Sequence, residues 1–170
     1  FLVKVETWFN MKVNFVDIGR QTVSIKKEID RAIADVIDNS NFILGEEVEL
    51  FENEFADYCN VKYAAGVDNG TSALELSLRA LGIGQGDEVI TQANTFIATS
   101  TSIVSAGAKP VLVDIKSEDY QIDIDKIEEK ITDKTKAIMP VHLYGNPVDI
   151  DFIKEIAEKY NLKIVEDACQ

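Results

Sequence analysis

The sequence predicts an α/β fold with three layers, in which helices cover both faces of a mostly parallel sheet. From residue 61 onward, short apolar segments alternate with amphipathic segments about a dozen residues long. Gly82 and Gly107 each follow an amphipathic segment, at the position where a glycine commonly ends a helix. The chain has 170 residues and is 46% hydrophobic, which suffices for one domain with a substantial core.

The expected elements follow one another along the chain. Apolar residues recur every three or four positions in the segments expected to be helical, at residues 24–40, 46–60, 72–82, 96–107, 122–131 and 149–161. Short apolar runs predict strands at residues 61–67, 86–91, 109–115, 135–145 and 162–168. The first two helices are expected to bury apolar stripes, formed by Ile25, Ile29, Ala32, Ile33 and Val36, and by Val48, Phe51, Phe55 and Tyr58.

Composition argues against several classes of partner. The chain carries 17 basic and 30 acidic residues, a net charge of −13, and such a surface repels nucleic-acid phosphates and anionic membranes. No apolar stretch is long enough to span a bilayer. Cys59 and Cys169 lie far apart without metal-site spacing, which is typical of packed thiols in a reducing cytosol. We therefore expect no nucleic acid, membrane or metal partner and a cytoplasmic location.

Three regions are expected along the chain. Residues 1–10 lack the features of a signal peptide and precede Met11, so we interpret them as a non-native or upstream leader. Residues 11–44 are expected to form an N-terminal arm and a packing helix. Residues 45–170 are expected to form an α/β segment with a mostly parallel sheet.

The segment GVDNGTSALE, residues 66–75, predicts an anion site. A strand is expected to end there, a turn to follow, and a helix to open at Thr71 and Ser72, where free N–H groups and the helix dipole favour a phosphate. Ser72 and Glu75 also have the spacing of a capping box, which requires no ligand. Both interpretations stay open on spacing alone.

Further candidates follow the other strands, because ligands of parallel sheets bind beyond the carboxyl ends of the strands. Phe96 could stack on a planar cofactor or pack in the core, next to Asn94 and Thr95 as turn and helix-capping residues. His142 is the only histidine and is more typical of a packing residue than of a catalytic base. Asp167 follows the last strand and could cap a turn or pair with a ligand.

These stretches together resemble the DegT/DnrJ/EryC1/StrS family of sugar-nucleotide aminotransferases, which are pyridoxal-phosphate enzymes of fold type I. The matching stretches are GEEVELFENEFADYC, NGTSALELSLRALGIGQGDEVI, NTFIATSTSIVSAGAKPVLVDI, TKAIMPVHLYG and IVEDACQ, in the order and spacing of that family. The resemblance implies that residues 45–170 are the front part of the large, pyridoxal-phosphate-binding domain of fold type I, which is incomplete in this chain.

The resemblance also implies roles for matched residues. Gly70, Thr71 and Ser72 would hold the cofactor phosphate, and Phe96 would stack on the pyridine ring. Asp167 would pair with the ring nitrogen, and Gln170 would reach the ring hydroxyl. His142 and Gly145 match the motif without an implied role. The segment at residues 42–45 would lie near the substrate, or would pack beneath the second helix.

Substrates and partners are likewise implied by the resemblance. The parent enzyme would pass an amino group from an amino acid, typically glutamate, to a keto-deoxy sugar linked to a nucleotide, in the biosynthesis of polysaccharide or secondary-metabolite sugars. It would act as a homodimer. The Schiff-base lysine of the family lies downstream of the matched stretches, so we expect this chain alone to be inactive. A sugar 3-dehydratase of the same family that lacks this lysine, and a non-catalytic truncated α/β domain, are the alternatives.

Overall fold

The structure is a computed structural model that describes residue 14 and residues 16–169. Our expectations for the leader, for the start at Met11 and for Gln170 therefore lie outside the described residues. The chain divides into two compact units, Phe1–Gly66 and Val67–Gln170. The candidate cofactor residues that the structure describes, from Gly70 to Asp167, all belong to the second unit, whereas the candidate substrate segment at residues 42–45 belongs to the first.

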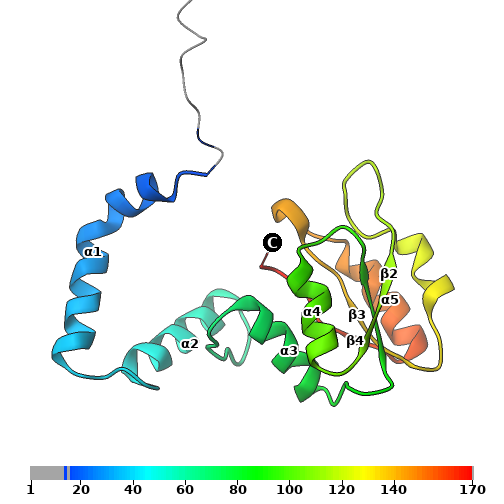
Figure 1. Ribbon diagram of the computed structural model, residues 1–170, viewed down its shortest axis with the longest axis horizontal. Helices are drawn as coiled ribbons and strands as arrows, with labels where there is room; N and C mark the ends of the chain where they lie inside the picture. Colours follow the sequence, from blue (N-terminus) through cyan, green and yellow to red (C-terminus); the bar gives the residue numbers. More distant parts are fainter. Residues whose placement is uncertain (1–13, 15, 170) are drawn as a thin grey trace, which may run out of the picture. The chain divides into compact units, whose positions relative to one another are not determined.

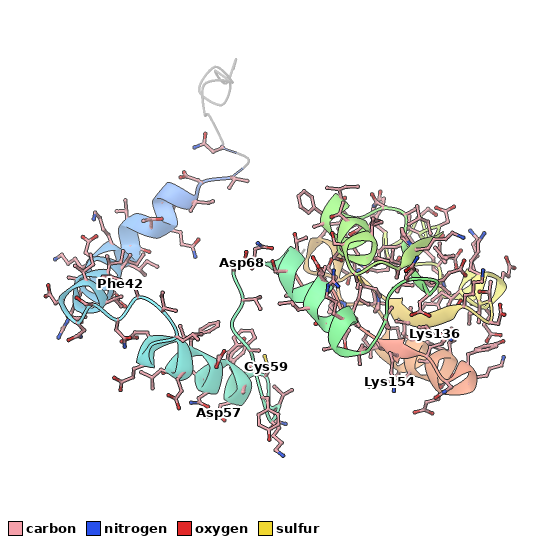
Figure 2. All side chains as sticks on the ribbon, turned by 60° about the horizontal axis from the view of Figure 1, so that its bottom comes forward. Phe42, Asp57, Cys59, Asp68, Lys136 and Lys154 are labelled. Atoms are coloured by element: carbon pink, nitrogen blue, oxygen red, sulfur yellow. The ribbon has the colours of Figure 1, made fainter. Side chains whose placement is uncertain are left out.

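The described part of the first unit contains the helices α1 (Ile18–Asp38) and α2 (Glu46–Tyr58). The side chain of Asp17 caps α1 by accepting the N–H of Arg20 at 3.1 Å. Phe42 lies in the connection between the helices and Cys59 follows α2, as Figure 2 shows. The side chain of Glu52 accepts the N–H of Gly66 at 2.7 Å and ties the end of the unit to α2.

We expected buried apolar stripes on these two helices, and this prediction is wrong. No residue of α1 is buried, and Ala56 is the one buried residue of α2. The stripe residues are instead solvent-accessible, with Ile33 54% exposed and Phe55 48% exposed. Among residues 16–66 there is no sheet or third helix that could cover them, and an amphipathic pattern alone does not bury a face. The strand expected at residues 61–67 is also absent, because this segment is irregular and pairs with no strand.

The second unit is built on a parallel sheet of four strands. These are β1 (Glu88–Gln92), β2 (Lys109–Val113), β3 (Thr135–Met139) and β4 (Lys163–Ile164), in the spatial order β2-β1-β3-β4. The helices are α3 (Gly70–Ala80), α4 (Ile97–Ser105) and α5 (Ile150–Tyr160). Figure 1 shows α3 and α4, in green, on one side of the strands and α5, in orange, on the other. The predicted α/β architecture is confirmed.

Alternation along the strands divides the core between the two faces of the sheet. Val89, Met139 and Val165 pack with residues of α3 and α4, whereas Ile90 and Ile138 pack with residues of α5. Successive side chains of a strand point to opposite faces, so neighbours in sequence enter different clusters. Because Asp167 lies two residues after Val165, the same alternation places its side chain on the face covered by α3 and α4.

Two expected elements differ in the structure. The helix expected at residues 122–131 is a pair of 3₁₀ turns, η1 (Ile124–Lys126) and η2 (Glu128–Lys130). Ile124 and Ile127 are three residues apart, a spacing that also fits the tighter 3₁₀ turn. The strand expected at residues 135–145 ends at Met139 because Pro140 follows, and a 3₁₀ turn, η3 (Leu143–Gly145), comes next.

A buried carboxylate braces the amino ends of the strands. Glu88 of β1 is 8% exposed and accepts from Lys109 Nζ at 2.9 Å and from the Thr132 hydroxyl at 2.8 Å. These two hydrogen bonds, first from Lys109 and then from Thr132, hold the pKa of Glu88 below its ordinary value of 4.5. The stability that Glu88 contributes is therefore present above pH 4.5 and is lost as the pH falls through its lower folded-state pKa.

We expect Glu88→Gln to weaken the fold at neutral pH and to flatten the loss of stability at acidic pH. Glutamine keeps the size of the side chain but binds no proton, so the pH-dependent contribution disappears. Chemical unfolding between pH 7 and about pH 3 measures the difference. The exposed Glu118→Gln is the matched control and should retain the slope of the parent chain. An unchanged acid limb in Glu88→Gln would contradict the expectation.

Candidate functional site

The candidate site lies at the carboxyl ends of the strands, where the segment after β4 pairs with the segment after β3. Asp167 forms a parallel bridge with Val141. Its N–H donates to the carbonyl of Pro140 at 2.9 Å, and its carbonyl accepts the N–H of His142 at 3.0 Å. The backbone of Asp167 is thus fixed although β4 itself ends at Ile164.

The carboxylate of Asp167 is buried between two hydrogen-bond donors. It is 0% exposed; Oδ2 accepts from the Thr99 hydroxyl at 2.7 Å and Oδ1 accepts from the Cys169 N–H at 3.1 Å. Thr99 lies on α4 and is itself 0% exposed. Within residues 16–169, no lysine, arginine or histidine forms an ion pair with Asp167. A buried carboxylate without a cation is costly unless a ligand supplies the positive charge.

The start of α3 adjoins this carboxylate through Cys169. The side chain of Asn69 caps α3 by accepting the N–H of Ser72 at 2.9 Å, so the N-cap is Asn69 and not Ser72, the cap in the alternative interpretation as a capping box. The N–H groups of Gly70 and Thr71 occupy the first helical turn, where no carbonyl of the helix can accept them. A Cβ at Gly70 would lie 2.5 Å from Cys169 Sγ, so the helix start and the segment after Asp167 are in close contact.

Phe96 is placed at the start of α4, after β1. It occupies the N-cap position, which we expected at Asn94 or Thr95, and it is 59% exposed. A phenylalanine this exposed is not a core residue, so the packing interpretation of Phe96 fails. The hydroxyl of the preceding Thr95 lies 2.9 Å from the hydroxyl of Thr99. Phe96 therefore lies at the start of α4, and Thr99 in the first turn of the same helix donates a hydrogen bond to Asp167.

His142 braces the loop after β3. Its Nδ1 accepts the N–H of Val148 at 3.1 Å, so the neutral ring carries its proton on Nε2 and donates it to Glu166 at 2.9 Å. Both ring nitrogens are used in these contacts, as in a packing residue. The side chains of Glu166 and Asp167 have different environments, because Glu166 is exposed whereas Asp167 is fully buried.

Neither cysteine is fully packed, although we expected packed thiols. Cys59 and Cys169 are both exposed and free of disulfides. The sulfur of Cys169 nevertheless lies against Gly70, and this partial burial, together with the negative charge of Asp167, raises the pKa of the thiol above its ordinary 9.0. The thiol is thus protonated at neutral pH and is a poor nucleophile.

Sequence reasoning missed Thr99 and the contact between Cys169 and Gly70. Two threonines four residues apart stand at the start of α4: Thr95 precedes the helix and Thr99 lies in its first turn. The spacing of the two threonines is visible in the sequence, but the residue that Thr99 contacts, Asp167, is 68 positions away. The distance in sequence hides the contact.

Other features lie away from this site. A pocket of about 480 Å³ is bounded by residues of η1, η2 and α5, among them Glu128, Phe152 and Lys159, on the face of the sheet opposite to α4. Within the described residues, no group of three or more histidine, cysteine or acidic side chains could hold a metal ion. None of the helices described is long and apolar enough to cross a membrane.

We expect Gly70→Ala to destabilise the second unit by about 1–3 kcal/mol, the usual cost of overpacking. The added methyl group would lie 2.5 Å from Cys169 Sγ and 3.3 Å from its Cβ, so Cys169 would have to move. Cys169→Gly removes both atoms, and the double variant should recover most of the loss. Urea unfolding of the four proteins measures the coupling. Additive effects of the two changes would contradict a direct contact.

Comparisons with known proteins identify relatives of this chain. The chain is 50% identical over 158 residues to the dTDP-3-amino-3,6-dideoxy-alpha-D-galactopyranose transaminase of Aneurinibacillus thermoaerophilus, over 93% of this chain and 44% of that protein. It is 45% identical over 159 residues to the dTDP-3-amino-3,4,6-trideoxy-alpha-D-glucose transaminase of Streptomyces venezuelae, over 94% of this chain and 42% of that protein. The chain therefore spans less than half the length of these relatives.

Solved structures have the same fold. The crystal structure of DesV from S. venezuelae has a TM-score of 0.91 at 45% identity, over 94% of this chain and 43% of that one. NtdA from Bacillus subtilis, solved with bound cofactor PMP, has a TM-score of 0.90 at 41% identity, over 94% of this chain and 37% of that one.

The family model also matches this chain. The model of the DegT/DnrJ/EryC1/StrS aminotransferase family matches residues 23–170, which include both α3 and Asp167. The family is dependent on pyridoxal phosphate, and neighbouring structures hold PMP or PLP. The chain belongs to the DegT/DnrJ/EryC1/StrS aminotransferase family.

Proposed function

We propose that this chain is the cofactor-binding front part of an enzyme that transfers an amino group from an amino acid, expected to be glutamate, to a nucleotide-linked keto-deoxy sugar. The names of its relatives support this substrate class, since they are transaminases of dTDP-linked and UDP-linked amino sugars. The observation that carries the proposal is the fully buried carboxylate of Asp167, which has two hydrogen-bond donors and no ion-pair partner within the described residues.

The residues present fit pyridoxal phosphate. A protonated pyridine nitrogen would be a positively charged partner for the carboxylate of Asp167. In turn, a carboxylate close to that nitrogen favours the protonated form of the ring. When bound, pyridoxal phosphate supplies an electron sink for breaking a bond at the amino-bearing carbon of the substrate. Asp167 would hold the proton on the ring nitrogen and thereby sustain this property.

The other roles concern binding and orientation. The N–H groups of Gly70 and Thr71 and the hydroxyls of Thr71 and Ser72 would donate to the phosphate, with the dipole of α3 adding to the attraction. The backbone N–H of Ser72 already donates to the side chain of Asn69, so it is not counted among the donors to the phosphate. The exposed ring of Phe96 would lie against one face of the pyridine. Gln170 would contact the ring hydroxyl and lies outside the described residues.

Turnover of two proteins tests the proposal. The 170-residue chain and a full-length protein that contains it are each mixed with pyridoxal phosphate, glutamate and a dTDP-linked keto-sugar. We expect amino-sugar formation from the full-length protein only, because the Schiff-base lysine is expected beyond the matched stretches. Turnover by the short chain would contradict the expectation that it is inactive alone. A full-length protein that binds no pyridoxal phosphate would refute the function itself.

A homodimer and a cytoplasmic location belong to the same proposal. Family resemblance suggests the dimer, and exposed apolar residues such as Phe42 and Ile43, 66% and 84% exposed, leave surface that an additional segment or subunit could cover. Light scattering of the full-length protein measures the oligomeric state. A monomer at micromolar concentration would remove the dimer from the proposal without affecting the cofactor site.

A further inference from the structure

We propose that Thr99 is the positioning residue that orients Asp167 toward the cofactor, with Thr95 orienting Thr99 in turn. This inference rests on the proposed function and adds a role for the hydroxyl of Thr99 on α4 and for the hydroxyl of Thr95, which precedes the helix. The contact joins residues 68 positions apart through a hydrogen bond of 2.7 Å, the shorter of the two hydrogen bonds to the Asp167 carboxylate.

Proton counting fixes the direction of this hydrogen-bond chain. An ionised carboxylate only accepts, so the hydroxyl proton of Thr99 must be donated to Asp167 Oδ2. Thr99 then has no proton left for the hydroxyl of Thr95 at 2.9 Å, and Thr95 must donate to it. The chain therefore runs from Thr95 through Thr99 to Asp167, and each hydroxyl is polarised toward the negative charge.

The surroundings of Thr99 favour a role in orientation. Thr99 and Asp167 are both 0% exposed, so bulk water cannot replace the hydroxyl as a donor. The N–H of Cys169 holds the other carboxylate oxygen at 3.1 Å. With one donor on each oxygen, the carboxylate cannot rotate freely, and its remaining lone pairs keep a set direction.

A purely structural role is the competing explanation. The same hydrogen bond also joins α4 to the segment after β4, and its loss could loosen the site in general. The two explanations differ in their dependence on the ring nitrogen. A general loosening weakens the binding of any ligand of the same shape, whereas a misoriented carboxylate weakens only ligands that carry the nitrogen.

The experiment compares pyridoxal phosphate with its 1-deaza analogue, in which carbon replaces the ring nitrogen. Dissociation constants are measured by fluorescence for the full-length protein and its variants. Thr99→Val removes the hydroxyl at nearly constant size, and Thr99→Ser retains it. Thr101→Val is the matched control, because the hydroxyl of Thr101 on the same helix bonds to the carbonyl of Ala98 at 3.2 Å and not to Asp167.

We expect Thr99→Val to weaken pyridoxal phosphate about tenfold, the value of one hydrogen bond to a charged group, and to leave the deaza analogue unchanged. Thr99→Ser and Thr101→Val should bind both ligands as the parent does. Equal weakening of both ligands by Thr99→Val, or no weakening of either, would overturn the inference. A parent protein that fails to bind pyridoxal phosphate would refute the proposed function instead, so the two failures are distinguishable.

Discussion

Asp167→Asn in the full-length enzyme should lower turnover on the order of a thousandfold, because removing one member of a buried charge pair costs about 3–5 kcal/mol. The amide has the shape of the carboxylate but lacks the charge that would keep the ring nitrogen protonated. Its oxygen can still accept the N–H of Cys169, and the hydroxyl of Thr99 can turn to accept from the amide nitrogen. The fold should therefore survive. Steady-state kinetics and thermal unfolding without cofactor measure the two effects.

Glu166→Gln is the matched control for this prediction. Glu166 is the neighbouring carboxylate, is exposed, and bonds to His142 at 2.9 Å without contacting Asp167 through its side chain. We expect close to parental turnover from this variant. Asp167→Ala should be at least as inactive as Asp167→Asn. If Asp167→Asn kept parental turnover, Asp167 would have no role at the cofactor.

Ile138→Ala should destabilise the second unit by about 2–5 kcal/mol, the usual cost of truncating a buried aliphatic side chain. Ile138 is 0% exposed and lies on β3, which pairs with both β1 and β4. Truncation leaves a cavity in the cluster beneath α5, which the surrounding parallel strands cannot readily fill. Denaturant unfolding at neutral pH measures the loss.

The same change at Ile97 provides the comparison. Ile97 is 66% exposed at the start of α4, so Ile97→Ala removes little buried surface and should cost less than about 0.5 kcal/mol. Equal losses for the two variants would mean that the packing beneath α5 does not hold the sheet together. Measuring the cofactor affinity of Ile138→Ala would show how strongly the position of Asp167 depends on an intact sheet.

The elements with strong local signals could be predicted from the sequence. The apolar runs of β1 and β2 are bounded by glycine and by turn residues, and α5 has both a regular stripe and an Asp149 cap. The strand expected at residues 61–67 failed because its apolar residues find no neighbouring strand. The stripe of α1 failed for a related reason, since periodicity predicts which face could be buried but not whether anything covers it.

The place of the candidate residues in the fold, as distinct from their roles, was predictable where a residue follows a strand or opens a helix. Asp167 follows a strand and Gly70 opens a helix, and both positions are visible in the sequence. Thr99 was not predictable, because a threonine in a helix has many possible partners and the sheet selects one far away in sequence. The close contact between Gly70 and Cys169 depends on the same long-range arrangement.

The lack of a cation beside Asp167 within residues 16–169 has a consequence for the stability of the protein. Without the cofactor, the folded chain keeps the carboxylate of Asp167 out of contact with water, which costs free energy. A cation bound beside it would lower that cost. Ligand binding to the native state alone shifts the folding equilibrium toward it. The protein with bound cofactor should therefore resist unfolding better than the same protein without it.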